Sequence, residues 1–549
     1  MDMRRMQVLM NRIQPEPPKK DYIAELNYIL EEAAKGNIVV LSSSDEEDED
    51  KPKTFNAPPL YIICLVRVYD FLKTMQWKAT GNTAFLRSIF TRKVEHDMWL
   101  SAFRVPTING HASIKESTEL VATDGLQRLD MRKKERDEED LILTMLTAET
   151  CKDLRTILCQ GLHFFTNNDA IDAVVRLSPN LEELHYPELV SLDAFENCKR
   201  IRIIKFHRLN KKGGEYFQNK DAKFPESLKN LEVFAFCCHY QASIPVHDMI
   251  SKVLESCPKV VSVGSIDSSK ALELLQKKNA DSHRQFQLRR CYWANGNDPT
   301  SEDNASSLPE TRQFSVIQAA VKMCPLLEEL IIKVSDPTCL THLQELKNLS
   351  ALYIAFDQKS NENIFELISL IKVIGPQLKH LSIEDKGEVP IDDILEYCSK
   401  LESLQIKGTM IVTESFKASY RFVPLKHLFV SKTDESSLLT LLRKCKHLTE
   451  LVLELVPWFD DNVFHKILRK NMLSKLEVFM ISRHDLSDES FELLLGSMRS
   501  LQNIGVAFSL EYYIKYLVRN LNHRVQVHKF FQYVGYHDFF SKIFDRCRF

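Results

Sequence analysis

The stretch Leu327-Glu-Glu-Leu330-Ile-Ile332 returns five more times in the form L-x-x-L-x-[IVL]. The further copies are Leu349-Ser-Ala-Leu352-Tyr-Ile354, Leu378-Lys-His-Leu381-Ser-Ile383, Leu401-Glu-Ser-Leu404-Gln-Ile406, Leu425-Lys-His-Leu428-Phe-Val430 and Leu448-Thr-Glu-Leu451-Val-Leu453. Their first residues are separated by 22, 29, 23, 24 and 23 positions. A motif that recurs at such a period indicates a solenoid, in which each repeat buries its apolar face against its neighbours. A solenoid offers a recognition surface, so we do not expect an enzyme active site to be the seat of function.

Weaker copies of the same motif extend on both sides of this block. They begin at Leu181, Ile201, Leu231, Val260, Leu476 and Leu501. Between copies, stretches such as Asp392–Cys398 and Glu435–Cys445 space their apolar residues as a helix does. The motif and its period resemble those of leucine-rich repeats. This resemblance implies an α/β fold: a leucine-rich-repeat solenoid with a parallel sheet on its concave side and helices on its convex side, preceded by a helical N-terminal segment.

Shifts in composition divide the chain into four predicted parts. Residues 1–57 are expected to be a mostly disordered N-terminal region with a short helix and an acidic linker. Residues 58–160 are expected to form a helical region that either docks an adaptor or caps the solenoid. Residues 161–509 hold the leucine-rich repeats, with an inserted polar loop near residues 295–313. Residues 510–549, dense in aromatic and basic residues, are expected to form a C-terminal cap.

The bulk composition argues against several classes of partner. The chain has 549 residues and a net charge of −3, from 72 basic and 75 acidic residues. This balance provides no overall attraction to nucleic acid or to an anionic membrane. No apolar run approaches the roughly 18–20 residues that span a bilayer, and the polar N-terminus does not resemble a signal peptide. We therefore expect a cytoplasmic or nuclear protein, or one found in both, that binds neither nucleic acid nor membrane.

Several cysteines occupy the same position relative to the repeat motif, and their spacing does not match a metal-binding pattern. Five of the 13 lie three residues before the first apolar residue of a repeat: Cys198, Cys257, Cys324, Cys398 and Cys445. This recurrence predicts a small buried slot at the turn into each strand, with the thiols reduced. The chain contains no zinc spacing, phosphate-binding glycine loop or nucleophile elbow. We therefore expect no catalytic residue, cofactor or metal ion, and no enzyme activity.

An apolar tetrad in the acidic linker resembles a SUMO-interacting motif. Ile38, Val39, Val40 and Leu41 precede Ser42, Ser43 and Ser44, and six acidic residues follow. The resemblance implies that the tetrad adds as a strand to an exposed sheet edge of SUMO, while the acids meet its basic rim. Each serine has an acid three positions later, so phosphorylation of the serines would add helpful charge. A solvated linker with a chance apolar tetrad is the alternative.

A second motif, Pro59-Leu60-x-x-x-Cys64-x-x-x-Val68, is similar to the elongin-binding box of cullin-RING substrate receptors. On a helix, Leu60, Cys64 and Val68 form one stripe that would enter an adaptor. PRAME-like and zyg-type receptors place this box just before leucine-rich repeats, as here. Pro59 departs from the usual small residue before the leucine, and the same spacing suits an ordinary core helix. An F-box-type adaptor module is the other possibility at this position, although the usual F-box opening is missing.

The concave side of the predicted sheet is the candidate surface for a protein target. Residues that flank the last aliphatic residue of each repeat should point to this side. Mixed charges with two aromatics suit a protein or peptide rather than nucleic acid. The residues selected in this way are His185, Lys205, His207, Tyr353, Ser382, Glu384, Gln405, Lys407, Phe429, Glu454 and Arg483.

Together these patterns lead to one functional expectation and one rival. The first is a substrate-recognition subunit of a cullin-RING ubiquitin ligase, in which residues 58–105 bind elongin C or an F-box-type adaptor and the repeats bind an unknown target. The rival is a non-catalytic interaction scaffold that reaches its partners, SUMO among them, through the concave side and the acidic linker.

Overall fold

The structure is a computed structural model that describes fifteen parts of the chain. These are residues 126–131, 142–143, 146–159, 168–208, 216–217, 219, 223–236, 246–278, 284–294, 311–358, 360–413, 422–470, 472–506, 514–518 and 525–529. The chain divides into two compact units. The first comprises Met1–Ile201, Pro225–Ser227 and Phe549, and the second comprises Arg202–Phe224 and Leu228–Arg548.

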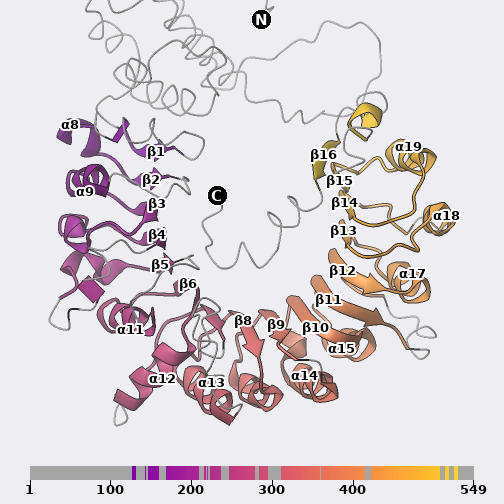
Figure 1. Cartoon of the computed structure of the whole chain (residues 1–549), viewed down its shortest axis with the longest axis horizontal. Coiled ribbons are helices and arrows are strands. Elements are labelled where there is room, and N and C mark those ends of the chain that lie inside the picture. Colours follow the sequence, from indigo (N-terminus) through magenta and orange to yellow (C-terminus); the bar gives the residue numbers. More distant parts are fainter. Residues whose placement is uncertain are drawn as a thin grey trace, which may run out of the picture. The chain divides into compact units, whose positions relative to one another are not determined.

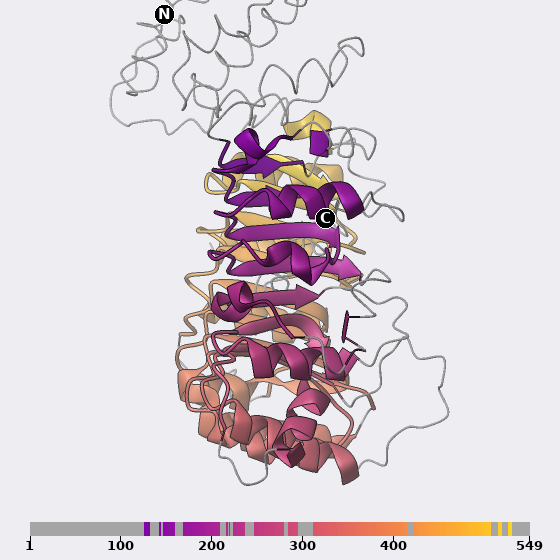
Figure 2. The ribbon, with the colours of Figure 1, turned by 90° about the vertical axis from the view of Figure 1, so that its left-hand side faces the viewer.

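The described part of the first unit contains three parallel strands with short helices between them. Strand β1 (Arg128–Asp130) pairs with β2 (Thr156–Leu158), which pairs with β3 (Glu183–Glu188). The helical elements are α8 (Ala148–Cys151), α9 (Asn168–Arg176) and the 3₁₀ turn η2 (Leu192–Phe195). In Figure 2 these strands lie parallel, one above the next.

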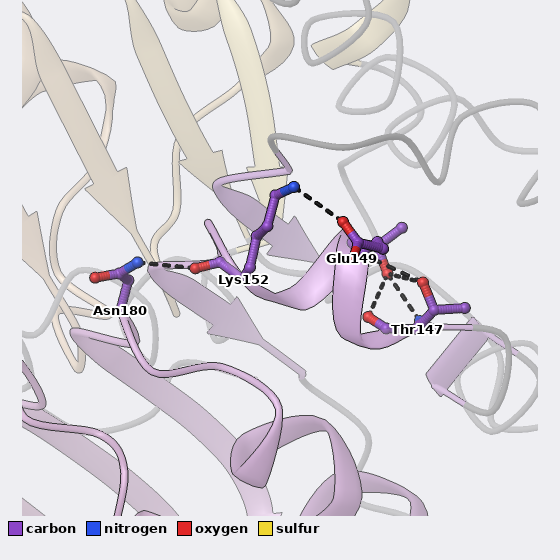
Figure 3. Close-up of polar contacts among 5 residues, drawn as sticks. Thr147, Glu149, Lys152 and Asn180 are labelled. Atoms are coloured by element: carbon purple, nitrogen blue, oxygen red, sulfur yellow. Dashed lines mark hydrogen bonds and ion pairs between the residues drawn. The ribbon is translucent and has the colours of Figure 1, made fainter.

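A network of polar contacts holds α8 in the first unit. Thr147 and Thr150 form a capping box, in which each side chain bonds the backbone N–H of the other. Lys152 Nζ lies 3.0 Å from Glu149 Oε2, and Asn180 Nδ2 donates to the carbonyl oxygen of Lys152 at 2.8 Å (Figure 3). The last contact joins the turn after α8 to the turn that leads into β3.

Strands β1 and β2 correct the sequence prediction, which assigned residues 58–160 to a helical region. The sheet begins earlier because Leu126-Gln-Arg-Leu129-Asp-Met131 and Leu154-Arg-Thr-Ile157-Leu-Cys159 keep apolar residues at the first, fourth and sixth positions of the repeat motif. All six of these side chains are buried. The charged run that follows Met131 favoured a helix and concealed this pattern.

The second unit repeats one strand and one helical element. Its strands are β4 (Ile203–Arg208), β5 (Val233–Phe236), β6 (Ser262–Asp267), β7 (Arg290–Trp293), β8 (Glu329–Val334), β9 (Ala351–Phe356), β10 (His380–Pro390), β11 (Ser403–Ile411), β12 (His427–Thr433), β13 (Glu450–Leu453), β14 (Val478–Ile481), β15 (Asn503–Val506) and β16 (Gln526–Lys529). Each pairs in parallel with the next, so strand order follows chain order.

The helical elements of this unit are α11 (Val246–Ser256), α12 (Ser269–Lys278), α13 (Thr311–Met323), η4 (Pro337–Glu345), α14 (Asn361–Ile374), η5 (Gly375–Gln377), α15 (Ile391–Tyr397), α17 (Glu435–Lys444), α18 (Asp461–Arg469) and α19 (Asp488–Ser497), and η3 (Glu226–Asn230) precedes β5. In Figure 1 the helices from α11 to α19 lie on the outer side of the sheet. The second unit is therefore a solenoid-like α/β arrangement, as the repeat predicts.

Two predicted boundaries differ from the structure. Helix α13 begins at Thr311, so the expected loop near residues 295–313 overlaps the first turn of a helix, and Gln313 is buried there. Strand β16 extends the sheet within residues 510–549, which were expected to form a cap. Val525 and Val527 supply too few apolar residues for the motif to be read from the sequence.

The six positions of the motif have distinct roles in packing. In the six clearest copies, positions 1, 4 and 6 are all 1% exposed or less. Burial of a leucine or isoleucine side chain contributes about 1.5–3 kcal/mol, so these positions form the core. The cysteine slot is also confirmed, because all five thiols are free and buried. Burial raises the pKa of the thiols of Cys198, Cys257, Cys398 and Cys445 to about 12.

One backbone contact joins each repeat to the next. The carbonyl oxygen at position 2 accepts two N–H groups from the following repeat, at its positions 2 and 3. Glu328 O, for example, accepts from Ser350 N at 2.8 Å and from Ala351 N at 3.1 Å. The same pair of bonds recurs in the second unit with the carbonyl oxygens of Arg202, Glu232, Val261, Arg289, Ser350, Lys379, Glu402, Lys426, Thr449 and Glu477.

Side chains at position 2 add charge pairs between neighbouring repeats. Arg202 donates two hydrogen bonds to the Glu232 carboxylate, at 2.8 and 2.7 Å. Lys426 Nζ lies 2.7 Å from Glu402 Oε2. These hydrogen bonds lower the pKa of Glu232 and of Glu402. Exposed pairs of this kind contribute roughly 0–1 kcal/mol each, so they favour the correct neighbour more than they stabilise the fold.

We expect Gly264→Ala to destabilise the second unit. Gly264 has a φ of 77°, and an added Cβ would lie 2.9 Å from the Cα of Ala235 on the neighbouring strand. The left-handed backbone alone would cost about 1–3 kcal/mol. Gly496→Ala is the matched control, because it lies in α19 with no heavy atom within 4 Å of an added Cβ. That change should stabilise by up to ~1 kcal/mol. Urea unfolding measures both, and a Gly264→Ala protein as stable as the wild type would contradict the expectation.

Candidate binding face

Position 5 of each repeat lies on the side of the sheet away from the helices. Positions 4 and 6 are buried on the helix side, and side chains alternate along a strand, so position 5 points the opposite way. We call this side of the second unit's sheet the strand face. The register aligns its position 5 residues in one row from β9 to β14: Tyr353, Ser382, Gln405, Phe429, Val452 and Met480.

Three residues of the strand face form a polar triad on β9, β10 and β11. Tyr353 donates its hydroxyl hydrogen to Glu384 Oε2. Lys407 Nζ lies 3.6 Å from the same carboxylate oxygen and 5.3 Å from the centroid of the Tyr353 ring. The Glu384 side chain is 48% exposed and the Lys407 side chain is 33% exposed. Charged and aromatic groups are therefore open to solvent together at the β9 end of the row.

Beside the triad, two buried polar side chains form a hydrogen bond with each other. Ser382 donates to Gln405 Oε1 at 3.2 Å, and both residues are buried. A buried hydroxyl or amide costs free energy unless it is hydrogen-bonded. This bond therefore links β10 to β11 and satisfies two polar groups that are not exposed.

Two apolar clusters also lie on the strand face. In one, Tyr292 and Tyr353 pack against Ile331 and Ala351 on β7 to β9. In the other, Phe429 and Val478 pack against Val452 and Met480 on β12 to β14. The triad thus has an apolar cluster on each side along the row, which is the mixture of anchors and polar groups that protein interfaces use.

The structure places the sequence-selected residues at several kinds of position. Tyr353, Ser382, Gln405 and Phe429 lie in the position 5 row, and Glu384 and Lys407 lie two residues further along their strands. Glu454 follows β13 directly, and exposed Arg483 follows β14 with a φ of 46°. Lys205 and His207 lie on β4 at the other end of the unit.

The remaining predicted residues lie elsewhere. His185 is on β3 of the first unit, where its Nε2 lies 2.8 Å from Glu183 Oε1. The proposed adaptor stripe, Leu60, Cys64 and Val68, lies outside the described residues. So do the SUMO-binding tetrad, Ile38, Val39, Val40 and Leu41, and the three serines Ser42, Ser43 and Ser44.

The sequence selection missed the aliphatic members of the position 5 row. Ile331 and Val452 occupy position 5 in two of the clearest motif copies, and Met480 does so in a weaker one. Tyr292 occupies the same position in Leu288-Arg-Arg-Cys291-Tyr-Trp293. Choosing only polar and aromatic residues passed over Ile331, Val452 and Met480, and Tyr292 was missed because its copy of the motif was not recognised in the sequence.

A histidine pair occupies position 3 on β10 and β12, in register with Ser403 between them. Burial lowers the pKa of His380 to about 4, and the nearby charges of His427 and two lysines add to the shift. His380 is therefore neutral at pH 7.

Comparison with known proteins adds no family assignment: no family model matches the sequence, and no curated protein matches it significantly. Within the described ranges there is no group of three or more His, Cys, Asp or Glu residues that could hold a metal ion. In the same part of the chain, every helix is too short or too polar to cross a bilayer.

We expect protonation of His380 to weaken the fold in acid. Histidine titrates near pH 6.5 when unfolded but near 4 in the folded protein, so the unfolded state binds the proton first. The stabilisation is present above pH 6.5 and is lost as the pH falls toward 4. At ~1.36 kcal/mol per pKa unit it amounts to at most about 3 kcal/mol, less with partial solvation. Urea unfolding at pH 7, 5.5 and 4 should show that His380→Gln loses less free energy of unfolding in acid than the wild type does. The control is His447→Gln, because His447 is exposed. An equal loss in wild type and His380→Gln, or a reduced loss in His447→Gln, would argue against the expectation.

Proposed function

We propose that this protein is a leucine-rich-repeat protein that binds a protein partner on its strand face. The observation that carries the proposal is the accessible triad of Tyr353, Glu384 and Lys407 beside apolar side chains. Support for the repeat class comes from the period of the motif, the burial of positions 1, 4 and 6, and one parallel strand in each repeat.

The charges of the strand face favour protein over nucleic acid. Lys407 on β11 forms an ion pair with Glu384 on the neighbouring β10, and Lys333 on β8 and Glu450 on β13 add one further charge of each sign. A nucleic-acid surface needs a continuous basic stripe. A mixed surface with tyrosine at its centre is suited to a peptide or folded protein, because tyrosine combines a large apolar area with a hydrogen-bonding group.

The cellular role we propose is that of a substrate-recognition subunit of a cullin-RING ubiquitin ligase. Its support is the resemblance of Leu60, Cys64 and Val68 to an elongin-binding box placed before the repeats. In this proposal the strand face selects the target, residues 58–105 bind elongin C or an F-box-type adaptor, and the chain itself catalyses nothing.

The second candidate is an interaction scaffold without an adaptor, and the SUMO-like tetrad at residues 38–41 supports it. Titration of SUMO against a peptide of residues 30–55 tests that tetrad.

Lys407→Glu should weaken binding of a partner at the strand face. The change places two carboxylates beside Tyr353 and reverses the local charge, so we expect a loss of affinity of about tenfold or more. Lys466→Glu is the matched control, because Lys466 forms a similar ion pair with Glu435 between two helices, with its Nζ 2.8 Å from Glu435 Oε1. Partners isolated with the wild-type chain are re-bound to each variant and their dissociation constants compared. Equal affinities for the two variants would remove the strand face from the binding site.

Leu60→Ala should abolish binding of elongin C if the adaptor proposal holds. The leucine would fill a pocket of the adaptor, and losing such an anchor costs about 2 kcal/mol or more. Ile62→Ala is the control, since on a helix it lies some 200° away from Leu60. Co-purification of the full chain with elongin C and with an F-box adaptor gives the result. Binding retained by Leu60→Ala excludes the box, and binding to neither adaptor excludes the ligase role.

A further inference from the structure

The turns that lead into the strands of the second unit lie at one edge of its sheet. Strands β9 to β15 pair in parallel and in register, so the residues just before them are neighbours in space (Figure 1). Each of these seven repeats has one exposed basic residue between the turn and position 2 of the motif. We call this set the basic edge: Lys347, Lys379, Lys400, Lys426, Lys446, Lys475 and Arg499.

The charge of the basic edge is strongly one-sided. In the described turns that hold the seven basic residues, the acidic residues are two, Glu402 and Glu477, and Glu402 is paired with Lys426. Neighbouring strands lie about 5 Å apart, which is less than the screening length of ~8 Å at physiological salt. The fields of successive cations therefore add, and this edge is positive although the whole chain has a net charge of −3.

Two lysines of the basic edge bind neutral groups of the protein. Lys347 Nζ donates to the carbonyl oxygen of Gln344 at 2.8 Å. Lys475 Nζ lies 3.3 Å from His447 Nδ1. Neither contact brings a carboxylate to the ammonium group, so the charge of both lysines is available to an acidic partner.

Acidic residues at the opposite edge of the same repeats are occupied differently. Asp434 accepts a hydrogen bond from Ser437 N at 2.9 Å, and Asp460 accepts one from Val463 N at 2.9 Å. These carboxylates cap the first turns of α17 and α18. A second copy of the chain would have to compete with these bonds, and pairing of unlike edges does not close into a dimer. The basic edge therefore favours a different protein as its partner.

We propose that the basic edge binds an extended acidic segment of a partner protein. Six strand spacings of about 4.8 Å make a row of roughly 29 Å from β9 to β15. An extended peptide of about nine residues has this length. Its acidic side chains pair with the cations, and it can place uncharged residues beside Glu402 and Glu477. The basic edge lies at the strand starts, outside the position 5 row, so this inference goes beyond the proposed function and does not rest on it.

A nucleic-acid strand fits the same edge less well. It carries a phosphate at every nucleotide, so it cannot leave out its charge beside Glu402 and Glu477. Surfaces that bind single strands also supply aromatic rings on which the bases stack. Among the described residues of these turns, Phe422 is the exposed ring beside the row, and Lys446 Nζ lies over it, 3.7 Å from its centroid. The observations therefore favour a peptide.

Titration of a labelled acidic peptide into the full-length protein tests the basic edge. The probe is a peptide of about twelve residues that alternates glutamate with serine, long enough to cover the row. Lys446→Glu/Lys475→Glu should lower the affinity about tenfold or more, and added salt should weaken binding to the wild type. Lys386→Glu/Lys432→Glu is the matched control, because it makes the same change in net charge at exposed lysines near the ends of β10 and β12. This control should bind the peptide as the wild type does.

A second edge variant, Lys400→Glu/Arg499→Glu, should give a similar loss and replaces the first if circular dichroism shows that the first is unfolded. A peptide with glutamine in place of each glutamate should not bind. Equal affinity for the two peptides, or an equal loss in the control variant, overturns the proposal.

Two further measurements separate the other occupants of the basic edge. Tighter binding of a single-stranded oligonucleotide of equal charge, lost in the edge variants, assigns the edge to nucleic acid and overturns the proposal. Sedimentation of the wild type as an oligomer that the edge variants dissociate assigns it to a second copy, with the same consequence. Absence of any partner at the strand face would remove the proposed function but leave the peptide result standing.

Discussion

The rest of the second unit depends on one pair of backbone hydrogen bonds. In this pair, the carbonyl oxygen at position 2 of a repeat accepts two N–H groups from the next repeat. It sets neighbouring repeats at the spacing of paired strands and leaves no freedom to slip by one residue. A slip would exchange the two faces of every strand and bring positions 1, 4 and 6 out of the core. Because the register is fixed in this way, position 5 side chains from distant parts of the chain form one continuous row.

The core was the part of the structure that the motif could predict, because burial at positions 1, 4 and 6 follows from periodicity alone. The cysteine slot followed for the same reason. Strands β1 and β2 escaped prediction because a charged run interrupts their repeats. The position of Met480 could be predicted from the motif, but the room that Gly505 of the next repeat leaves for its side chain could not. A motif states which way a side chain points. It does not state how much space the residues of the neighbouring strand leave for that side chain.

The strand face combines two environments that would serve the proposed recognition in different ways. The triad of Tyr353, Glu384 and Lys407 is solvated, so its charges steer and orient a partner more than they bind it. The apolar cluster of Phe429, Val452, Val478 and Met480 would supply apolar contacts, which make a complex long-lived. Affinity and orientation would then come from separate places on the same face.

The cysteine slots have a consequence beyond packing. Their raised pKa values leave almost no thiolate at neutral pH, and thiolate is the form that reacts. Each thiol therefore becomes reactive only when its own repeat opens. Since stability in such arrays is a sum of contacts between nearest neighbours, Cys257, Cys324, Cys398 and Cys445 mark four separate places along the second unit. The chain carries its own reporters of where unfolding starts and in which direction it spreads.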